Sequence, residues 1–286
     1  MNGAKIRLIA EHADPVRNAL KKSIDAEKVV SDFFSNHFSS NITTQEARDW
    51  AKVHITFNSS YLDTALKVIY AEGYTLGEDI ANAALATQLI VKAPTAQQMT
   101  RASQINWKDW KPGNRAAANL VSPKGGLSKL IANRGVTIQG IRGTTLDRIG
   151  TQLAYALQKG LPPSAVSGTV ADLIGAPSEA RAGYLLQLGY DAVTAVTTDY
   201  ERALTIAQTE MSSAVSVANR DLYVSAGVEQ VEWLTADPCD ECQENEDVSP
   251  IGIDETFPSG DTEPPAHPNC VCDIAPYVVE VSPEEE

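Results

Sequence analysis

The feature that most constrains this sequence is the distribution of its cysteines. All four cysteines of the 286-residue chain, and one of its four histidines, lie between Asp237 and Cys272, in a segment that begins DPCDEC and closes EPPAHPNCVC. A chain of this length can bury roughly three-quarters of the surface that its unfolded form exposes, so it needs no covalent cross-links to fold. The gathered thiols therefore need a different role, and metal binding is the first to consider.

The charge of the chain is unevenly distributed along it. The formal net charge is −14, but residues 221–286 carry 18 of the 37 acidic residues and no basic one. Between Lys92 and Arg148, ten basic residues are opposed only by Asp109 and Asp147. The chain thus has a basic middle and an acidic end, which bears on its partners and not on its fold.

No targeting segment is expected from the sequence. The N-terminal stretch MNGAKIRLIAEHADP has too short an apolar patch for a secretory signal, and no stretch approaches the ~18 apolar residues of a membrane span. We therefore expect a protein that is made in a cytoplasm and has no membrane-spanning segment. Thiols are reduced there, which favours metal or redox chemistry over structural disulfides.

Helical periodicity dominates the N-terminal third of the chain. Asp14 and Pro15 have the character of an N-cap and a first-turn residue, and they predict one helix that begins there. Thr43 and Glu46 match a capping box, which predicts the start of a second helix. Two further helices are expected, separated at Gly73.

The C-terminal half continues this helical pattern and then changes. Helices are expected in LSKLIANRG, in TTLDRIGTQLAYALQKG with its end at Gly160, and from about Asp199 to Ser225 with a stop at Gly227. Beyond this glycine, VEQVEWLTAD and CDIAPYVVEV have the alternation of strands. Hydrophobic residues make up 43% and aromatic residues 6% of the chain, an ordinary globular composition.

These patterns predict a mainly α-helical body with a small α+β C-terminal domain that a zinc ion clamps. The expected divisions are an N-terminal helical domain (1–93), a basic connector (94–126), a second helical domain (127–227), a Cys/His domain (228–278) and an acidic tail (279–286).

The spacing of the Cys/His residues predicts a structural zinc site. Cys239 and Cys242 have C-x2-C spacing, and His267 and Cys270 have H-x2-C spacing. Two such knuckles complete a tetrahedron and leave no open position for catalysis. We predict these four residues as the ligands. Cys272 is the spare donor, because a residue two positions further along an incipient strand is expected to point to the opposite face.

Two alternatives to a structural zinc site stay open. A third interpretation, a catalytic zinc site, is rejected. The thiols can be reduced and half buried, as free cysteine tolerates. Disulfides between Cys239 and Cys270, or between Cys242 and Cys272, are an alternative if the mature particle leaves the cell. A zinc deaminase is rejected, because its H-x-E half is missing: no other histidine has Glu two positions later.

A second candidate site lies in the basic connector. The sequence NWKDWK interleaves tryptophan with lysine, a composition that can stack on bases and neutralise phosphates. The predicted contact residues for a portal protein or for DNA are Trp107, Lys108, Trp110, Lys111 and Arg115. The alternative is a structural strap with a buried tryptophan. No phosphate-binding loop or catalytic triad is found in the sequence.

Residues from about 200 to 278 carry a resemblance to a known family. The matching positions, in chain order, are Thr209, Glu210, Trp233, Asp237, Cys239, Cys242, Pro264, Pro265, His267, Pro268, Cys270 and Cys272. In this combination the segment resembles the C-terminal domain of the phage Mu F-like, or head morphogenesis, family of minor capsid proteins. It departs from that family at Gln208, where Arg is frequent, and at Val271, which replaces the Arg of a CRC sequence.

The resemblance implies a virion protein without enzymatic activity. Such a protein is made in the host cytoplasm, lies inside the particle near the portal vertex, and assists head assembly and DNA packaging or delivery. The implied partner is the portal protein, with the major capsid or scaffold protein and genomic DNA as further partners. The alternative is a zinc-dependent or ADP-ribosyltransferase-type toxin enzyme. Glu210, of the Thr-Glu pair, is expected to form a buried hydrogen bond that ties its helix to the C-terminal domain. The alternatives are an acceptor for His267 and an acid/base residue.

Overall fold

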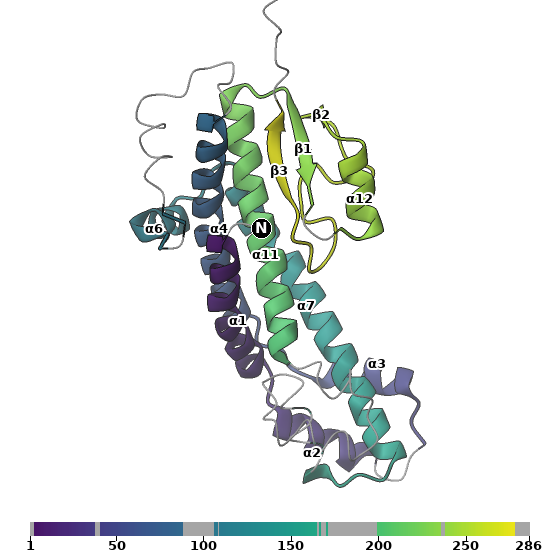
Figure 1. Ribbon diagram of the computed structural model, residues 1–286. Helices are drawn as coiled ribbons and strands as arrows, with labels where there is room; N and C mark the ends of the chain where they lie inside the picture. Colours follow the sequence, from purple (N-terminus) through teal and green to yellow (C-terminus); the bar gives the residue numbers. More distant parts are fainter. Residues whose placement is uncertain are drawn as a thin grey trace, which may run out of the picture. The chain divides into compact units, whose positions relative to one another are not determined.

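A computed structural model describes residues 3–37, 41–87, 106–107, 109–164, 166, 170, 199–235 and 238–277 (Figure 1). The chain is mainly helical and has a small three-stranded sheet near its C-terminus, which confirms the predicted fold class. The helices are α1 (Gly3–Ser23), α2 (Ala26–His37), α3 (Thr44–His54), α4 (Ser60–Thr87), α6 (Gly113–Val121), α7 (Gly125–Gln158), α11 (Asp199–Ala226) and α12 (Asp240–Asp247). The strands are β1 (Gln230–Leu234), β2 (Ile251–Gly252) and β3 (Asp273–Tyr277). Residues 94–105 of the predicted connector and the predicted tail 279–286 lie outside the described residues.

Two compact units make up the chain. The first contains Met1–Ala10, Lys67–Ala132 and Thr205–Glu286, and the second contains Glu11–Leu66 and Asn133–Leu204. Each unit is assembled from segments that are far apart in the sequence, so neither corresponds to one of the domains expected from the order of the patterns. All five predicted metal donors belong to the first unit.

The first helix differs from its prediction. α1 begins at Gly3 and continues through Pro15, the residue at which a helix start was expected. The reason is that Ala4 and Leu8 are buried one turn apart, so the apolar face of this helix begins well before the proline. The helical run then stops at residues 24–25, which separates α1 from α2.

The capping box of α3 is confirmed. The Thr43 hydroxyl accepts from the amide of Glu46 at 3.2 Å, and the Glu46 carboxylate accepts from the amide of Thr43 at 2.8 Å. Within the same unit, α3 lies directly against α7 at Gly150. A Cβ atom on Gly150 would lie 2.5 Å from the Cα atom of Arg48, so only glycine allows this approach.

The predicted break at Gly73 is wrong, because α4 runs through this residue without interruption. The glycine serves close helix packing instead. A Cβ atom on Gly73 would lie 2.8 Å from Ala214 Cβ, and one on Gly77 would lie 2.4 Å from the carbonyl oxygen of Val215. Real Cβ atoms do not approach so closely, so α4 and α11 touch through their backbones at these two positions.

Two predicted helix ends are confirmed. Gly160 and Gly227 follow α7 and α11 with φ values of 66° and 77°, the left-handed conformation that glycine adopts without steric cost. In both cases the next amide bonds back to a carbonyl of the last turn. α7 itself is one helix from Gly125 where two were expected, and α6 lies within the segment predicted as a connector.

The sheet has the order β2-β1-β3, and β1 pairs with both neighbours in antiparallel fashion. In Figure 1 it lies between α11 and α12. Val231 and Trp233 of β1 point inward, and Trp233 lies opposite Ile274 of β3. The Trp233 ring contacts Phe257 edge to face, with ring centroids 4.9 Å apart. Both strands agree with the alternation found in the sequence.

This C-terminal region shares its core with the helices. Ala81 and Leu85 of α4 and Tyr223 of α11 belong to the same buried cluster as Trp233 and three of the cysteines. The apolar side chains of the predicted Cys/His domain therefore share one core with α4 and α11.

Candidate metal centre

The five predicted donors lie in a polar segment that we call the Cys/His loop (Cys239–Cys272). Cys239 is the N-cap residue of α12 and has an extended backbone, and Cys242 lies in the first turn of this helix. His267 and Cys270 lie in the irregular part of the loop, and Cys272 directly precedes β3. Each pair is thus carried by a short turn, as knuckle spacing predicts.

The second turn is shaped by two local features. Asn269 has φ of 69°, a left-handed conformation that asparagine tolerates better than most residues. The amide of Cys270 donates to the carbonyl oxygen of His267 at 3.2 Å. Together they reverse the backbone, so that a single short turn carries both donor side chains.

The donor atoms form two overlapping triads. His267 Nε2 lies 3.1 Å from Cys239 Sγ and 3.3 Å from Cys242 Sγ, and these three atoms make the first triad. Cys242 also belongs to a second triad with Cys270 and Cys272, and its Sγ atom lies 3.8 Å from Cys270 Sγ. Within each triad all donor atoms lie within 4.8 Å of one another. The cluster can therefore hold a metal ion.

One sulfur–sulfur separation in the cluster matches that of a tetrahedral metal site. Two sulfur ligands of a tetrahedral zinc with bonds of about 2.3 Å are separated by roughly 3.8 Å, which equals the observed separation of Cys242 and Cys270. His267 Nδ1 lies 2.9 Å from the carbonyl oxygen of Pro268, the usual partner of a metal-binding imidazole. A proton on Nδ1 would leave the Nε2 lone pair directed at the sulfurs.

The thiols differ in their acidity. A hydrogen bond from Cys272 lowers the pKa of the Cys270 thiol to about 5, whereas burial raises the pKa of the Cys242 thiol to about 12. A hydrogen bond from the backbone of Cys242 lowers the pKa of Cys239. Metal ions bind thiolates, so occupation of the cluster would release protons from the thiols that are still protonated.

The prediction for Cys272 needs correction. Its side chain was expected to point away from the other donors, but its Sγ atom lies in the buried triad. The expectation assumed regular strand alternation from Cys270 onward. β3 begins only at Asp273, so the two cysteines precede the strand and are not bound by its alternation.

Side chains of α11 hold the backbone of the second knuckle. Gln208 Nε2 donates to the carbonyl oxygen of Asn269 at 2.7 Å, and the amide of Asn269 donates to Thr209 Oγ1 at 3.0 Å. One turn further, Ser212 Oγ donates to the carbonyl oxygen of Cys270 at 3.3 Å. Gln208, which replaces the frequent Arg of the resembled family, thus contacts this turn directly.

A buried lysine completes this backbone support. Lys5 of α1 is 0% exposed, and its Nζ atom donates to the carbonyl oxygen of Cys272 at 3.4 Å. The same ammonium group lies 3.5 Å from the Asp273 carboxylate, which also accepts from Asn219 at 3.3 Å. Sequence reasoning missed Lys5, because nothing local marks a contact between residues 267 positions apart.

The sequence did contain a signal for the α11 contacts. Ser212, Ser216 and Asn219 are polar residues at helical spacing on a helix that is otherwise rich in alanine and valine, and all three are 0% exposed. Buried polar side chains need hydrogen-bond partners. Such a stripe predicts that the helix faces polar groups, and two of these residues do: Ser212 bonds the Cys270 carbonyl of the Cys/His loop, and Asn219 bonds the Asp273 carboxylate of β3.

Glu210 does not serve His267. Its carboxylate accepts a hydrogen bond of 2.5 Å from the hydroxyl of Tyr70, which joins α11 to α4. Burial raises the pKa of this carboxyl group, and the Tyr70 bond opposes that shift. Among the expectations for Glu210, the structure supports the buried hydrogen bond, although its partner lies on α4 and not in the C-terminal region.

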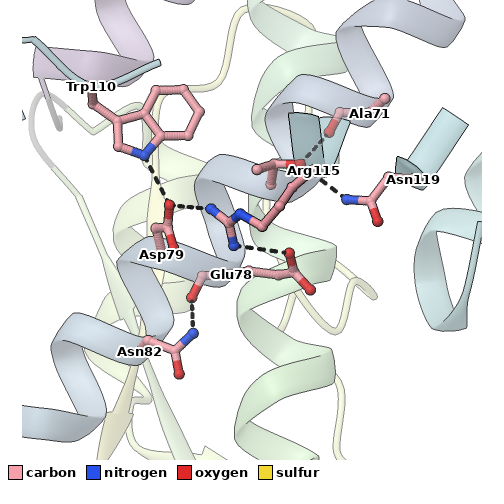
Figure 2. Close-up of polar contacts among 8 residues, drawn as sticks. Ala71, Glu78, Asp79, Asn82, Trp110, Arg115 and Asn119 are labelled. Carbon is pink, nitrogen blue, oxygen red and sulfur yellow. Dashed lines mark hydrogen bonds and ion pairs between the residues drawn. The ribbon is translucent and has the colours of Figure 1, made fainter. Parts of the chain in front are cut away.

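The basic connector is partly an internal contact (Figure 2). Trp110 is 7% exposed, and its indole Nε1 donates to Asp79 of α4 at 2.9 Å. Arg115 donates to the same Asp79 carboxylate and lies 3.6 Å from Glu78. Both side chains are held by α4. Trp110 is buried, whereas the Arg115 side chain is 35% exposed, so its contact with a portal protein or DNA stays a prediction.

The other predicted contact residues differ in their surroundings. Lys111 is exposed and Trp107 is half-buried, whereas Lys108 lies outside the described residues. Among the described helices, none has the length and apolarity that a membrane crossing requires. No family model, curated protein or solved structure matches the chain.

Proposed function

We propose that this chain is a phage minor head protein, related to the Mu F-like or head morphogenesis family, that binds at the portal vertex. The observation that supports this most is the connectivity of the residues that carry the resemblance. Thr209 of the Thr-Glu pair bonds to the turn between His267 and Cys270, and Trp233 shares a buried core with three of the cysteines. Residues spread along the chain from Thr209 to Cys272 thus serve one local structure.

In this proposal the metal is zinc, and its role is structural. Five protein donors surround a site that needs four, so no position is left open for a reactive water. The Cys/His loop has few apolar side chains of its own, and a bound cation would fix its ends. The alternative, a zinc-dependent toxin enzyme, requires three protein ligands and an open fourth position.

The proposed partners follow from the charge division. The portal protein is the main partner, with the major capsid or scaffold protein and genomic DNA as further ones. No described residue after Arg220 is basic, so we expect the Cys/His region to be repelled by phosphate. Trp107, Lys108, Lys111 and Arg115 remain the proposed contact residues of the connector, whereas Trp110 is buried.

Co-purification tests this function. The full chain is expressed with a tag together with the portal protein of the same phage, and the complex is captured and crosslinked. We expect the portal protein in the eluate, with crosslinks outside residues 228–277. Lys111→Glu should reduce the recovery, whereas Glu244→Gln, an exposed acidic site on α12, should leave it unchanged. Absence of the portal protein from wild-type eluates would contradict the proposal.

A further inference from the structure

We infer that Cys272 is a ligand of the metal and that Cys239, a member of the predicted set, is the donor that can be dispensed with. This inference rests on the proposed structural metal site and specifies its ligands as Cys242, His267, Cys270 and Cys272. Cys272, which the spacing of the Cys/His residues in the sequence marked only as a spare donor, thereby becomes a ligand.

Burial distinguishes the two triads. Cys242, Cys270 and Cys272 are 2%, 2% and 4% exposed, whereas Cys239 is exposed. Thiolates that are already desolvated and converge on one point interact strongly with a cation, because little water remains to compete with it. The buried triad therefore supplies three of the four ligands that zinc requires.

Preorganisation points to the same set. The carbonyl groups of Cys270 and Cys272 accept hydrogen bonds from Ser212 of α11 and Lys5 of α1. These bonds fix the backbone on both sides of the two thiols before any metal binds. The support of Cys239 is local to α12, since its carbonyl group accepts from the amide of Gln243 in the same short helix. A rigidly supported donor loses less entropy on binding than a free one.

The fourth ligand is His267. Its Nε2 atom lies 3.3 Å from Cys242 Sγ, the atom that both triads share. Its Nδ1 atom lies beside the Pro268 carbonyl, which sets the orientation of the ring. With imidazole as the fourth ligand, the buried centre carries one negative charge less than with Cys239, and burial of the extra charge would be costly.

Lys5 is a positioning residue of this centre. Its ammonium group bonds the Cys272 carbonyl and the Asp273 carboxylate and is fully buried. It thereby ties the start of α1 to the backbone of a ligand. Loss of such outer partners usually lowers metal affinity by about 10–100-fold. Lys5→Met should therefore weaken zinc binding by roughly 10-fold or more, and Lys5→Arg should restore part of the loss.

Alkylation of the wild-type protein tests the ligand set without any variant. Reduced full-length chain is treated with iodoacetamide with and without one equivalent of zinc, and each cysteine is followed by mass spectrometry. We expect Cys239 to react at the same rate in both samples. A strong slowing of Cys239 by zinc would overturn the inference, while the metal site itself would stand. Failure of the chain to retain any zinc would overturn both.

Two single variants provide the second measurement. Zinc affinity is determined by chelator competition, and cobalt(II) replaces zinc to report the thiolate ligands through charge-transfer absorption. Cys272→Ser should bind zinc at least ~100-fold more weakly, whereas Cys239→Ser should stay within ~10-fold of wild type with unchanged cobalt absorption. The opposite ranking would restore the predicted set. Circular dichroism of each variant verifies that the helices are intact.

Discussion

Two regions of the first unit are stabilised in different ways. At the α4–α11 contact, Gly73 and Gly77 let two long helices touch through their backbones, and the surrounding side chains are buried. The Cys/His loop has one short polar helix, a two-residue strand and five metal donors. The first region is stable by direct packing, whereas we propose that the second depends on a bound cation. On this proposal, one unit contains a part that tolerates metal loss and a part that does not.

The largest expected effect comes from a substitution that disrupts the Cys/His loop and leaves the α4–α11 contact intact. Cys242 belongs to both triads, so Cys242→Ser removes the donor that every ligand set needs. We expect loss of the metal and of its contribution to folding, which for structural zinc is on the order of 10 kcal/mol of apparent free energy. Zinc analysis and limited proteolysis of residues 238–277 measure this. Wild-type zinc affinity in this variant would contradict the clamp.

The next largest effect is expected from a substitution that disrupts the α4–α11 contact. A Cβ atom on Gly77 would lie 2.4 Å from a carbonyl oxygen and 2.7 Å from Ala218 Cβ. Gly77→Ala should therefore lower the free energy of unfolding by about 2–3 kcal/mol. The control is Gly140→Ala in α7, where a Cβ meets nothing within 4 Å and should add about 0.5–1 kcal/mol. Denaturant titration compares them, and an equal response of both variants would refute close backbone contact.

A smaller change in stability is expected in the connector, whose residues Trp110 and Arg115 are held against α4 by packing and by the charge of Asp79. Asp79→Asn weakens the acceptor that Trp110 and Arg115 share, and we expect a loss of about 1–2 kcal/mol. Tryptophan emission should also shift to longer wavelength as Trp110 becomes wetter. Asp109→Asn, at an exposed site, is the control and should change neither quantity. A wild-type melting temperature for Asp79→Asn would mean that the connector is not held by this carboxylate.

The smallest expected effect is a pH dependence of the free energy of unfolding, which Glu210 introduces at the α4–α11 contact. Burial raises the pKa of Glu210 in the folded state above its ordinary value of 4.5. The protonated form therefore favours folding, and that contribution is lost as the pH rises through the folded-state pKa. Glu210→Gln mimics the protonated form, so it should be more stable than wild type at neutral pH and equal to it below the ordinary pKa. A constant difference between pH 3 and 8 would contradict this assignment.

The sequence predicted those features that depend on local chemistry. Thr43 and Glu46 satisfy amides within one turn, and Gly227 adopts a conformation that few other residues accept, so both boundaries were correct. The alternation around Trp233 identified β1 for the same local reason. The five donors were also found, because knuckle spacing places ligands within short turns.

The failures depend on distant contacts. Glycine at a helix end and glycine at a helix crossing look alike in a sequence, and only the proximity of α11 makes Gly73 a packing residue. The predicted direction of the Cys272 side chain was wrong because the start of β3 is set by its pairing with β1. Lys5 was missed because it contacts the Cys/His loop only in the folded chain. Such features follow from tertiary structure and leave no local pattern.

Hydrogen exchange of the wild-type chain, with one bound zinc and after its removal by a chelator, tests the central claim most directly. The claim is that a metal ion holds the Cys/His loop while packing holds the helices. We predict one zinc per chain, and on chelation a loss of protection in residues 238–277 with retained protection in the α4–α11 contact around Gly73 and Gly77. Unchanged protection of the loop in the metal-free protein would contradict the account.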